Sequence, residues 1–248
     1  MTNILILGGT AEASLLAEAV ARASLRATLS YAGRVANPSA QPIPVRTGGF
    51  GGVAGLVGYL ADERISHLID ATHPFAAEMS RHAVAAARQT ATPLIALQRA
   101  EWQIGPGDRW TRVADIPAAA SALTGPPLRI FLAIGRQHLA DFAGQPQHHY
   151  LLRLVDPPGA PLPLPHATAI IARGPFSESG DIDLLRTHQI DTIVAKNAGG
   201  SGAEAKLIAA RRLSIPVILI DRPVLPMRRV TATVAGVMAW LHATPLGV

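Results

Sequence analysis

Thr72 and His73 lie where an apolar, strand-like run of residues gives way to an alanine-rich, helix-like one. Asp70 ends the first run and Pro74 opens the second. Because a proline disfavours helical backbone in the residue before it, we expect His73 in an extended loop, where its imidazole can donate a hydrogen bond or exchange a proton near neutral pH. Two interpretations stay open: a catalytic proton donor beside a bound ligand, or a cap on its own helix.

The first turn of the chain has the composition of a phosphate-binding turn. Its two glycines permit a tight bend, Thr10 can cap the helix that follows, and the first N–H groups of that helix attract a phosphate. Thr10 and Ala13 replace two glycines of the dinucleotide fingerprint, and a turn without any ligand would look similar. Because it comes first in an α/β chain, we predict that this turn binds a nucleotide. The predicted residues are Gly8, Gly9, Thr10, Ala11 and Glu12.

The end of the second predicted strand favours NADP over NAD. This region contains Ser30 and Arg34 and no acidic residue. An acidic side chain at this place binds the free 2′-hydroxyl of NAD, whereas arginine accommodates the 2′-phosphate of NADP. A solvated loop arginine is the alternative explanation. With NADPH bound in this half of the chain, we expect Thr72 and His73 beside its nicotinamide.

Two loops in the second half of the chain combine glycine with a cation or an aromatic ring. The loop at 195–206 contains Lys196, and successive loop N–H groups with a lysine make a cradle for an anion. In the turn at 173–180, Phe176 is available to pack on a flat ligand. Each loop alone is ordinary loop chemistry, but together they favour a carboxylate-rich ligand. The predicted substrate-binding residues are Phe176, Lys196, Asn197, Gly199, Gly200, Ser201 and Arg222.

Composition narrows the classes of function. The formal charge of +5 favours an anionic partner, but the basic residues are scattered and aromatic residues make up only 4% of the chain. Twenty of the 22 basic residues are arginine, so we interpret the charge as a compositional bias, with a polyanionic small-molecule ligand, rather than nucleic acid, as the alternative explanation. No apolar run approaches the roughly 18 residues that span a bilayer. Without cysteine, and without histidines at ligand spacing, we expect a cytoplasmic protein with no metal site.

Strand-like and helix-like segments alternate along the chain, which predicts parallel sheets with helical crossovers. The strand-like runs are 4–7, 27–31, 67–70, 93–97, 129–134, 150–155, 168–172, 192–195 and 216–220, with short strands at 110–113 and 228–231.

The chain also repeats itself. Residues 83–99 align without a gap with residues 206–222, and the order of the matching segments indicates a duplication. In this alignment 72–75 lies opposite 197–200. We predict an α/β protein of two Rossmann-like lobes with parallel sheets and a ligand cleft between them. The expected lobes are 1–124, which binds NADPH, and 125–248, which binds substrate, with an exchange of the terminal units 101–124 and 226–248 as a further hypothesis.

The segments LGGTAE, TGGFGG, IDATHPFA, RAEW, ARGPF, VAKNAGGSG, AARRLSIPVI and DRP follow one another in this order over nearly the whole chain. Together they resemble the precorrin-6A reductase family of cobalamin (vitamin B12) biosynthesis. The resemblance implies an NADPH-dependent reduction of one double bond in the precorrin-6A macrocycle, giving precorrin-6B, with a hydride added to one ring carbon and a proton to its neighbour. It implies no metal and no flavin, and a substrate that is large, conjugated and rich in carboxylates.

Two alternatives stay open at this level. The family acts on precorrin-6A or on its cobalt form, and we expect the metal-free substrate. The alternative from a different class of function is a non-catalytic tetrapyrrole-binding or trafficking protein that keeps the nucleotide-binding fold. In both cases we expect no nucleic-acid and no membrane partner, and contacts with neighbouring enzymes of the pathway are a further expectation.

Overall fold

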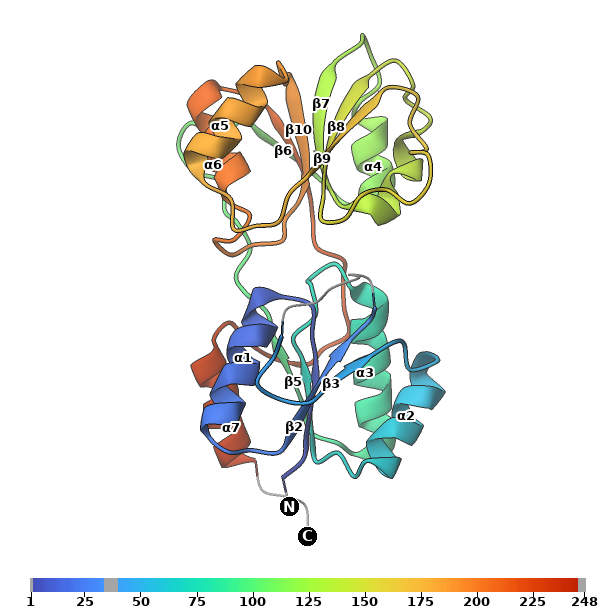
Figure 1. The fold of residues 1–248 in the computed structure, drawn as a ribbon, viewed down its shortest axis with the longest axis vertical. Helices are drawn as coiled ribbons and strands as arrows, with labels where there is room; N and C mark the ends of the chain where they lie inside the picture. The colour runs from blue at the N-terminus through green and yellow to red at the C-terminus, as the bar shows by residue number, and fades with distance from the viewer. Residues whose placement is uncertain (1, 34–39, 245–248) are drawn as a thin grey trace. The chain divides into compact units, whose positions relative to one another are not determined.

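The computed structural model describes residues 2–33 and 40–244, so the predicted cofactor residue Arg34 lies outside the described residues. The chain divides into two compact units, Met1–Ala100 with Val224–Val248, and Glu101–Pro223. Each unit is built on a six-stranded sheet in which every strand pair is parallel (Figure 1). The predicted class, two Rossmann-like α/β lobes with parallel sheets, is confirmed.

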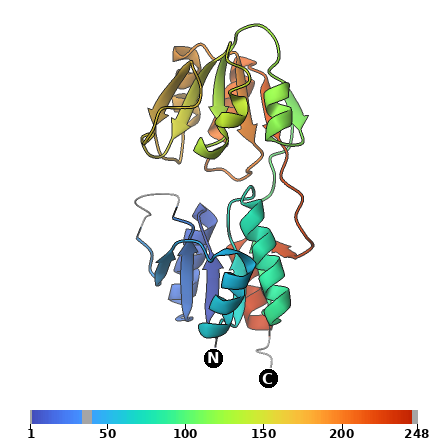
Figure 2. The same ribbon diagram turned by 90° about the vertical axis from the view of Figure 1, so that its right-hand side faces the viewer.

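The first unit has the strand order β12-β5-β4-β1-β2-β3. Helices α1 and α7 cover one face of this sheet and α2 and α3 the other; the latter pair faces the viewer in Figure 2. The strands are β1 (Ile4–Leu7), β2 (Ala27–Tyr31), β3 (Val45–Thr47), β4 (His67–Asp70), β5 (Leu94–Leu97) and β12 (Arg229–Thr231), and the helices are α1 (Ala11–Arg22), α2 (Gly52–Asp62), α3 (Ala77–Thr90) and α7 (Val234–Ala243).

Alternation along β1 explains why both faces of the first sheet are covered. Ile4 and Ile6 belong to the cluster packed by α1 and α7, whereas Leu5 and Leu7 belong to the cluster packed by α2 and α3. All four side chains are at most 1% exposed. Burying each one stabilises the fold by about 1.5–3 kcal/mol, so β1 is a rigid base for the turn that follows it.

The second unit has the strand order β6-β11-β10-β7-β8-β9, with α5 and α6 on one face and α4 on the other (Figure 1). Its strands are β6 (Trp110–Val113), β7 (Arg129–Ala133), β8 (His149–Leu154), β9 (Ala167–Ile171), β10 (Thr192–Lys196) and β11 (Val217–Ile220), and its helices are α4 (Ile116–Ser121), α5 (Glu178–Thr187) and α6 (Ala205–Leu213), with short 3-10 turns η1 (Arg136–His138) and η2 (Ala140–Phe142).

Each sheet takes one edge strand from a distant part of the chain. β6 pairs with β11 in the second sheet, and β12 pairs with β5 in the first. The two units therefore do not coincide with residues 1–124 and 125–248. The physical reason is burial: Trp102 lies in the core of the second unit and Trp240 in the core of the first, so each chain segment continues into the unit where its aromatic residue is covered.

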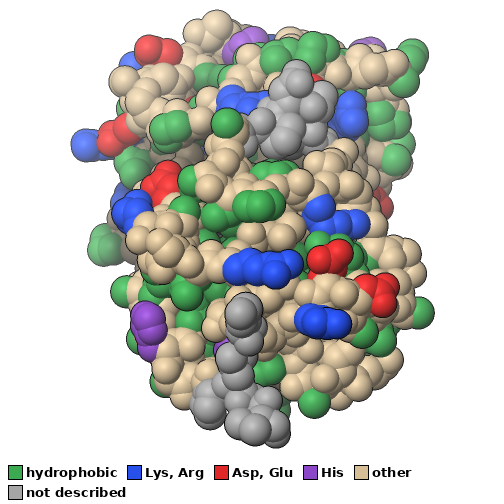
Figure 3. Space-filling model, turned by 60° about the horizontal axis from the view of Figure 1, so that its bottom comes forward, with side chains coloured by type: hydrophobic (Ala, Val, Ile, Leu, Met, Phe, Trp, Pro, Cys, Tyr) green, Lys and Arg blue, Asp and Glu red, His purple; other side chains and the backbone are tan. Residues whose placement is uncertain are grey.

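The sequence did not predict β3. This strand is three residues long and follows a proline-containing stretch, so neither its length nor its pattern distinguishes it from a loop. It extends the first sheet beyond β2. Within the described residues, no helix is long and apolar enough to cross a membrane. On the face of the first unit that Figure 3 shows, basic, acidic and apolar side chains are interspersed.

Candidate functional site

The turn after β1 brings the backbone close to the neighbouring strand. A side chain on Gly8 would place its Cβ 2.7 Å from Cδ1 of Leu29, so only glycine fits without a shift. Gly9 has a φ of +121°, which L-residues rarely adopt. The N–H of Gly8 donates to the carbonyl of Ser30 at 2.9 Å, which ties the turn to the end of β2. The backbone here is exposed to an incoming ligand and rigidly held.

Thr10 links this turn to the loop after β4. Its Oγ1 accepts a hydrogen bond from the N–H of Ala13 at 3.1 Å, which confirms the predicted helix cap. The same hydroxyl donates to the carbonyl of Ala71 at 2.9 Å. The unbonded N–H groups at the start of α1 therefore lie next to the loop that carries Thr72 and His73.

Glu12 is an acidic residue in the first turn of α1. Without a partner, its negative charge would repel a phosphate bound at this helix N-terminus. Its Oε2 lies 2.7 Å from Nη1 of Arg99, and the two side chains are only 24% and 19% exposed. Arg99 thus neutralises Glu12, which leaves the helix N-terminus favourable for a phosphate.

Asp70, the last residue of β4, organises the loop that follows. Its Oδ1 accepts from the backbone N–H and the Oγ1 of Thr72 at 3.2 and 2.7 Å, and its Oδ2 accepts from Oγ of Ser80 at 2.6 Å. With the carboxylate almost fully buried, these three bonds fix the direction in which the loop leaves the sheet.

His73 contacts its own turn. Nδ1 accepts a hydrogen bond from the N–H of Phe75 at 3.2 Å, and the carbonyl of His73 accepts from the N–H of Ala76 at 2.7 Å. Nδ1 can accept only when it carries no proton, so the neutral ring has its proton on Nε2. Helix α3 begins at Ala77 and has no side-chain cap, so His73 caps the turn before the helix rather than the helix itself.

Arg46 lies beside the end of β2, and the sequence pattern did not indicate it as a site residue. It lies on β3, and its Nη1 donates to Oγ of Ser30 at 2.9 Å and to the carbonyl of Gly48 at 2.9 Å. Its Nη2 donates to the carbonyl of Gly49 at 3.2 Å. Ser30 itself is buried, so Arg46 presents the polar group at this strand end. The missed strand hid this residue, because without β3 nothing places Arg46 beside Ser30.

The guanidinium of Arg46 also stacks on two rings. It lies 3.9 Å from the ring centroid of Phe50 and 5.1 Å from that of Tyr59. Burial and the charge of Glu63 raise the pKa of Tyr59, and the charge of Arg46 opposes them. Within the described residues Arg46 forms no ion pair, and its contacts leave Nε and one Nη2 hydrogen as a parallel pair of donors. That pair matches the two oxygens of a phosphate.

In the second unit, Asn197 follows β10 at the position equivalent to Thr72. Its side chain is fully buried and bonds the backbone of Trp102: Oδ1 accepts from the N–H at 2.9 Å, and Nδ2 donates to the carbonyl at 3.3 Å. The indole Nε1 of Trp102 donates to the carbonyl of Gly200 at 2.8 Å. The amide of Asn197 is thus committed to the chain segment that enters the second unit.

The other predicted substrate residues of this loop divide into two groups. Arg222 donates from Nε and Nη2 to the carbonyls of Asn197 and Ala198, at 2.9 and 3.1 Å, and so fixes the loop backbone. Lys196 is half-buried at the end of β10, Gly199 and Gly200 adopt positive φ values of +69° and +72°, and Ser201 is exposed. The structure therefore brings Lys196, Asn197, Gly199, Gly200, Ser201 and Arg222 together in one loop cluster.

Phe176 lies against a neighbouring part of the second unit. A Cβ on Gly174 would lie 3.4 Å from the carbonyl of Gly202, so the turn containing Phe176 adjoins the glycine loop. The guanidinium of Arg153 lies 4.0 Å from the centroid of the Phe176 ring and pairs with buried Asp181. One face of Phe176 is therefore occupied by an arginine.

Each unit also has a surface cavity. One of about 290 Å³ lies in the first unit, and one of about 300 Å³ lies in the second, where Arg136 and the proline-rich loop 158–163 line it. In the part of the chain that the structure describes, no group of three or more His, Asp or Glu side chains could hold a metal ion.

Comparison with known proteins gives consistent results. The family model for precorrin-6x reductase CbiJ/CobK matches residues 3–242. A precorrin-6A reductase of Rhodobacter capsulatus is 62% identical over 251 aligned positions, covering 100% of both chains, and one from a Sinorhizobium species is 52% identical over 89% of this chain and 85% of its own. A cobalt-precorrin-6A reductase of Priestia megaterium is 29% identical over 89% of this chain and 90% of its own. A solved structure of a CobK precorrin-6A reductase matches with a TM-score of 0.95 at 62% identity, over 100% of both chains.

Proposed function

The chain belongs to the precorrin-6x reductase family, and from that premise we propose that it uses NADPH, bound by the first unit, to reduce metal-free precorrin-6A to precorrin-6B. That it is a reductase of a corrin precursor in cobalamin biosynthesis follows from the family. The observation that carries the cofactor assignment is the edge of the first sheet, where the glycine turn after β1 and the guanidinium of Arg46 present phosphate-binding groups at two adjacent strand ends.

The residues present fit a dinucleotide with a 2′-phosphate. The close approach of Gly8 to Leu29 and the positive φ of Gly9 leave the backbone accessible where a pyrophosphate binds in such folds. Arg46 offers two parallel N–H donors at the end of the second strand, the place where the ribose is bound. Arg34, which the sequence favours for the same phosphate, is retained in the proposal as a second cation.

NADPH supplies the hydride when it is bound. The chain's own contribution lies in the loop after β4, where Asp70 fixes Thr72 by two hydrogen bonds and Thr10 holds the carbonyl of Ala71. His73, with its proton on Nε2, is the side chain of this loop that can donate a hydrogen bond to the substrate. To act as the proton donor the ring first takes a second proton on Nδ1, which gives up the bond from the N–H of Phe75, and Nε2 then passes its proton to the ring atom next to the reduced carbon.

The second unit binds the carboxylates of the macrocycle in this proposal. Lys196 supplies a positive charge, and the N–H groups of the loop from Gly199 to Ser201 supply donors that need no side chain. Asn197 and Arg222 contribute by holding that loop in shape. The cavity beside Arg136 is large enough for a carboxylate-bearing side arm of a macrocycle. Phe176, with one face on Arg153, retains its other face for the conjugated ring.

The relatives support metal-free precorrin-6A over its cobalt form. The relatives named precorrin-6A reductase are 42–62% identical to this chain, whereas those named cobalt-precorrin-6A reductase are 28–32% identical. The loop cluster of the second unit offers cations and backbone N–H groups, which bind carboxylates in either form, so the preference rests on the relatives alone.

Loss of NADPH absorbance tests this proposal against a non-catalytic tetrapyrrole-binding protein. We expect consumption of one NADPH per precorrin-6A reduced, and none when either the protein or the precorrin is omitted. Tight binding of precorrin-6A without any oxidation of NADPH or NADH would favour the binding protein. Faster turnover of the cobalt form than of the metal-free form would overturn the substrate assignment.

A further inference from the structure

Arg228 is a buried cation that the reaction described above does not use. It precedes β12, in the C-terminal segment (residues 224–248) that returns from the second unit to the first sheet. Its side chain is 7% exposed, its Nε lies 3.8 Å from Oδ2 of Asp70, and its Nη2 donates to Oε1 of Gln98 at 2.9 Å. Within the described residues Nε has no hydrogen-bond partner, so charge alone links it to the carboxylate.

The partner of Arg228 is the residue that organises the candidate site. Asp70 is 2% exposed on its side chain, and burial of a carboxylate is costly unless a cation or hydrogen-bond donors lie against it. Its two oxygens hold Thr72 and Ser80 by three hydrogen bonds. The direction of the loop that carries His73 therefore depends on where the carboxylate of Asp70 is held.

We propose that Arg228 is a positioning residue of the reductase: its buried guanidinium lies against the carboxylate of Asp70 and holds it in place, and Asp70 in turn holds Thr72 and His73 in their reactive arrangement. The inference rests on the proposed site in the first unit. The site then depends on a cation from the segment in which the chain returns to the first unit. Arg228 lies only five residues after Pro223, the last residue of the second unit.

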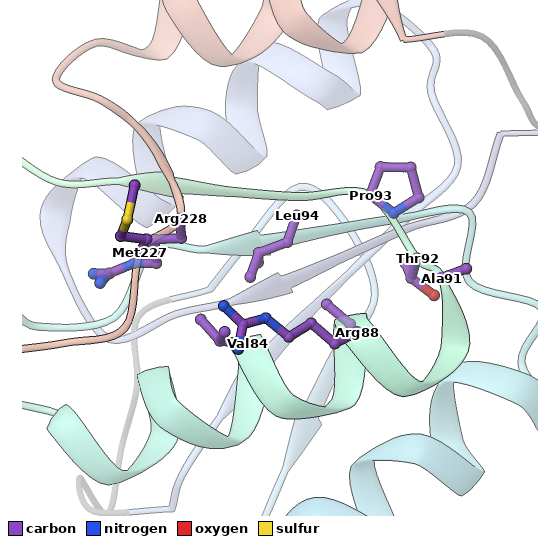
Figure 4. A pocket seen from close by; sticks show the side chains of 9 residues that line it. Val84, Arg88, Ala91, Thr92, Pro93, Leu94, Met227 and Arg228 are labelled. Atoms are coloured by element: carbon purple, nitrogen blue, oxygen red, sulfur yellow. The ribbon is translucent and has the colours of Figure 1, made fainter.

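The cavity of the first unit allows this inference to be tested by chemical rescue. Arg228 lines the cavity of about 290 Å³ together with Met227, Arg88, Val84 and Leu94 (Figure 4). Met227 is 93% exposed, so the cavity opens to solvent beside it. Truncation of Arg228 to alanine extends this cavity, and a small guanidinium ion from solution can then take the place of the missing side chain.

The experiment compares Arg228→Ala and Arg228→Lys with wild type in steady-state kinetics. We expect Arg228→Ala to lower kcat by at least about tenfold, as for a small misplacement of reacting groups, with little change in the KM for NADPH. Guanidinium chloride at low, non-denaturing concentration restores a large part of kcat, whereas potassium chloride at the same ionic strength does not. Arg228→Lys, which retains the charge, keeps more activity than Arg228→Ala.

Two further measurements separate positioning from general support of the fold. Hydrogen–deuterium exchange without any ligand should become faster at 71–76 in Arg228→Ala and stay unchanged at 4–7 and 94–97. The control is Arg112→Ala, which removes a half-exposed cation of an edge strand of the other sheet that pairs with Asp221 at 2.7 Å and with Glu101 at 3.6 Å, neither of them a predicted site residue. We expect Arg112→Ala to leave kcat unchanged.

Three results would overturn the proposal. They are wild-type kcat in Arg228→Ala, equal loss of protection over the whole first unit, and recovery with potassium chloride as good as with guanidinium. Failure of the proposed site looks different: Thr72→Val and His73→Asn would then leave kcat unchanged, whatever Arg228→Ala does.

Discussion

The loops after β4 and β10 occupy the same position in the two sheets, yet their polar side chains have different partners. β4 lies beside β1 and β10 beside β7, with Asp70 opposite Leu7 and Ala195 opposite Ala133. After β4, Asp70 bonds Thr72 within the loop itself. After β10, the equivalent residue of Thr72, Asn197, bonds the backbone of Trp102, 95 residues away.

The difference shows how one duplicated loop can serve two purposes. In the second unit the loop anchors the segment that crosses from one unit to the other, and its side-chain amide is consumed in doing so. In the first unit Arg228 of the returning segment lies 3.8 Å from Asp70, and the side chains of Thr72 and His73 bond within the loop. A polar residue at the carboxyl edge of a sheet therefore does not by itself indicate a ligand.

Removal of the anchoring amide should have the largest effect. Asn197→Ala loses both bonds to Trp102 and leaves the buried N–H of Trp102 without its acceptor. We expect a loss of about 3 kcal/mol in the free energy of unfolding, measured by urea denaturation. Ser201→Ala, an exposed change in the same loop, is the control and should alter stability very little. A loss below about 1 kcal/mol would mean that the loop does not anchor the crossing segment.

At His73 we expect a large loss of kcat with little loss of stability, whereas the main effect of Asn197→Ala is on stability. His73→Asn keeps a hydrogen-bond donor but removes the ring, so stability should change little while kcat falls by about a hundredfold, as for a lost general acid. The measurement is kcat as a function of pH, with the melting temperature as the control. If turnover and its pH profile survive, the proton comes from another source and His73 only positions the loop.

Arg46 sharpens the comparison because it stacks on Phe50 and bonds Ser30, whereas the arginine that stacks on Phe176 in the second unit, Arg153, is paired with Asp181. Arg46→Ala should weaken NADPH binding by about 2 kcal/mol, or about thirtyfold, and leave NADH unchanged, because only NADPH has the 2′-phosphate. Arg34→Ala, measured in the same way, shows how much Arg34 contributes to NADPH binding. An unchanged ratio of kcat/KM for the two cofactors in both variants would place the phosphate elsewhere.

Lys196 tests the proposed role of the second loop in substrate binding. Lys196→Ala should weaken precorrin-6A binding by about tenfold or more, through loss of a charge-assisted bond, and leave NADPH binding unchanged. Equal weakening of both ligands would show that Lys196 supports the fold instead.

The sequence predicts features that depend on residues close together in the chain better than contacts between residues far apart in it. The duplication, the parallel sheets and the cap by Thr10 follow from local patterns, and the structure confirms them. The bond between Asn197 and Trp102 could not be predicted, because it exists only where the chain crosses between units. Arg46 was missed because β3 is too short to show a period.

The smallest expected effect concerns acid stability at the opposite end of β4. Burial lowers the pKa of His67, which is 1% exposed, from the ordinary value of 6.5, and the edge of Trp240 packs against it. A neutral His67 stabilises the fold fully above about pH 6.5, and this stability is lost as the pH falls, by at most about 1.4 kcal/mol per pH unit. β10 begins with Thr192 instead and has no such dependence.

Urea unfolding at about pH 5 and about pH 7.5 checks this prediction. The difference between the two pH values should be smaller in His67→Gln than in wild type. The same difference in both proteins would assign the acid sensitivity to other groups.

Hydrogen–deuterium exchange of the wild-type protein with and without NADPH tests the division of work between the two loops most directly. We expect NADPH to slow exchange at 8–12, 46–52 and 71–76, and to leave exchange at 197–202 unchanged. Protection of 197–202 without protection of 8–12 and 71–76 would contradict this expectation, because the loop after β10 would then bind the cofactor.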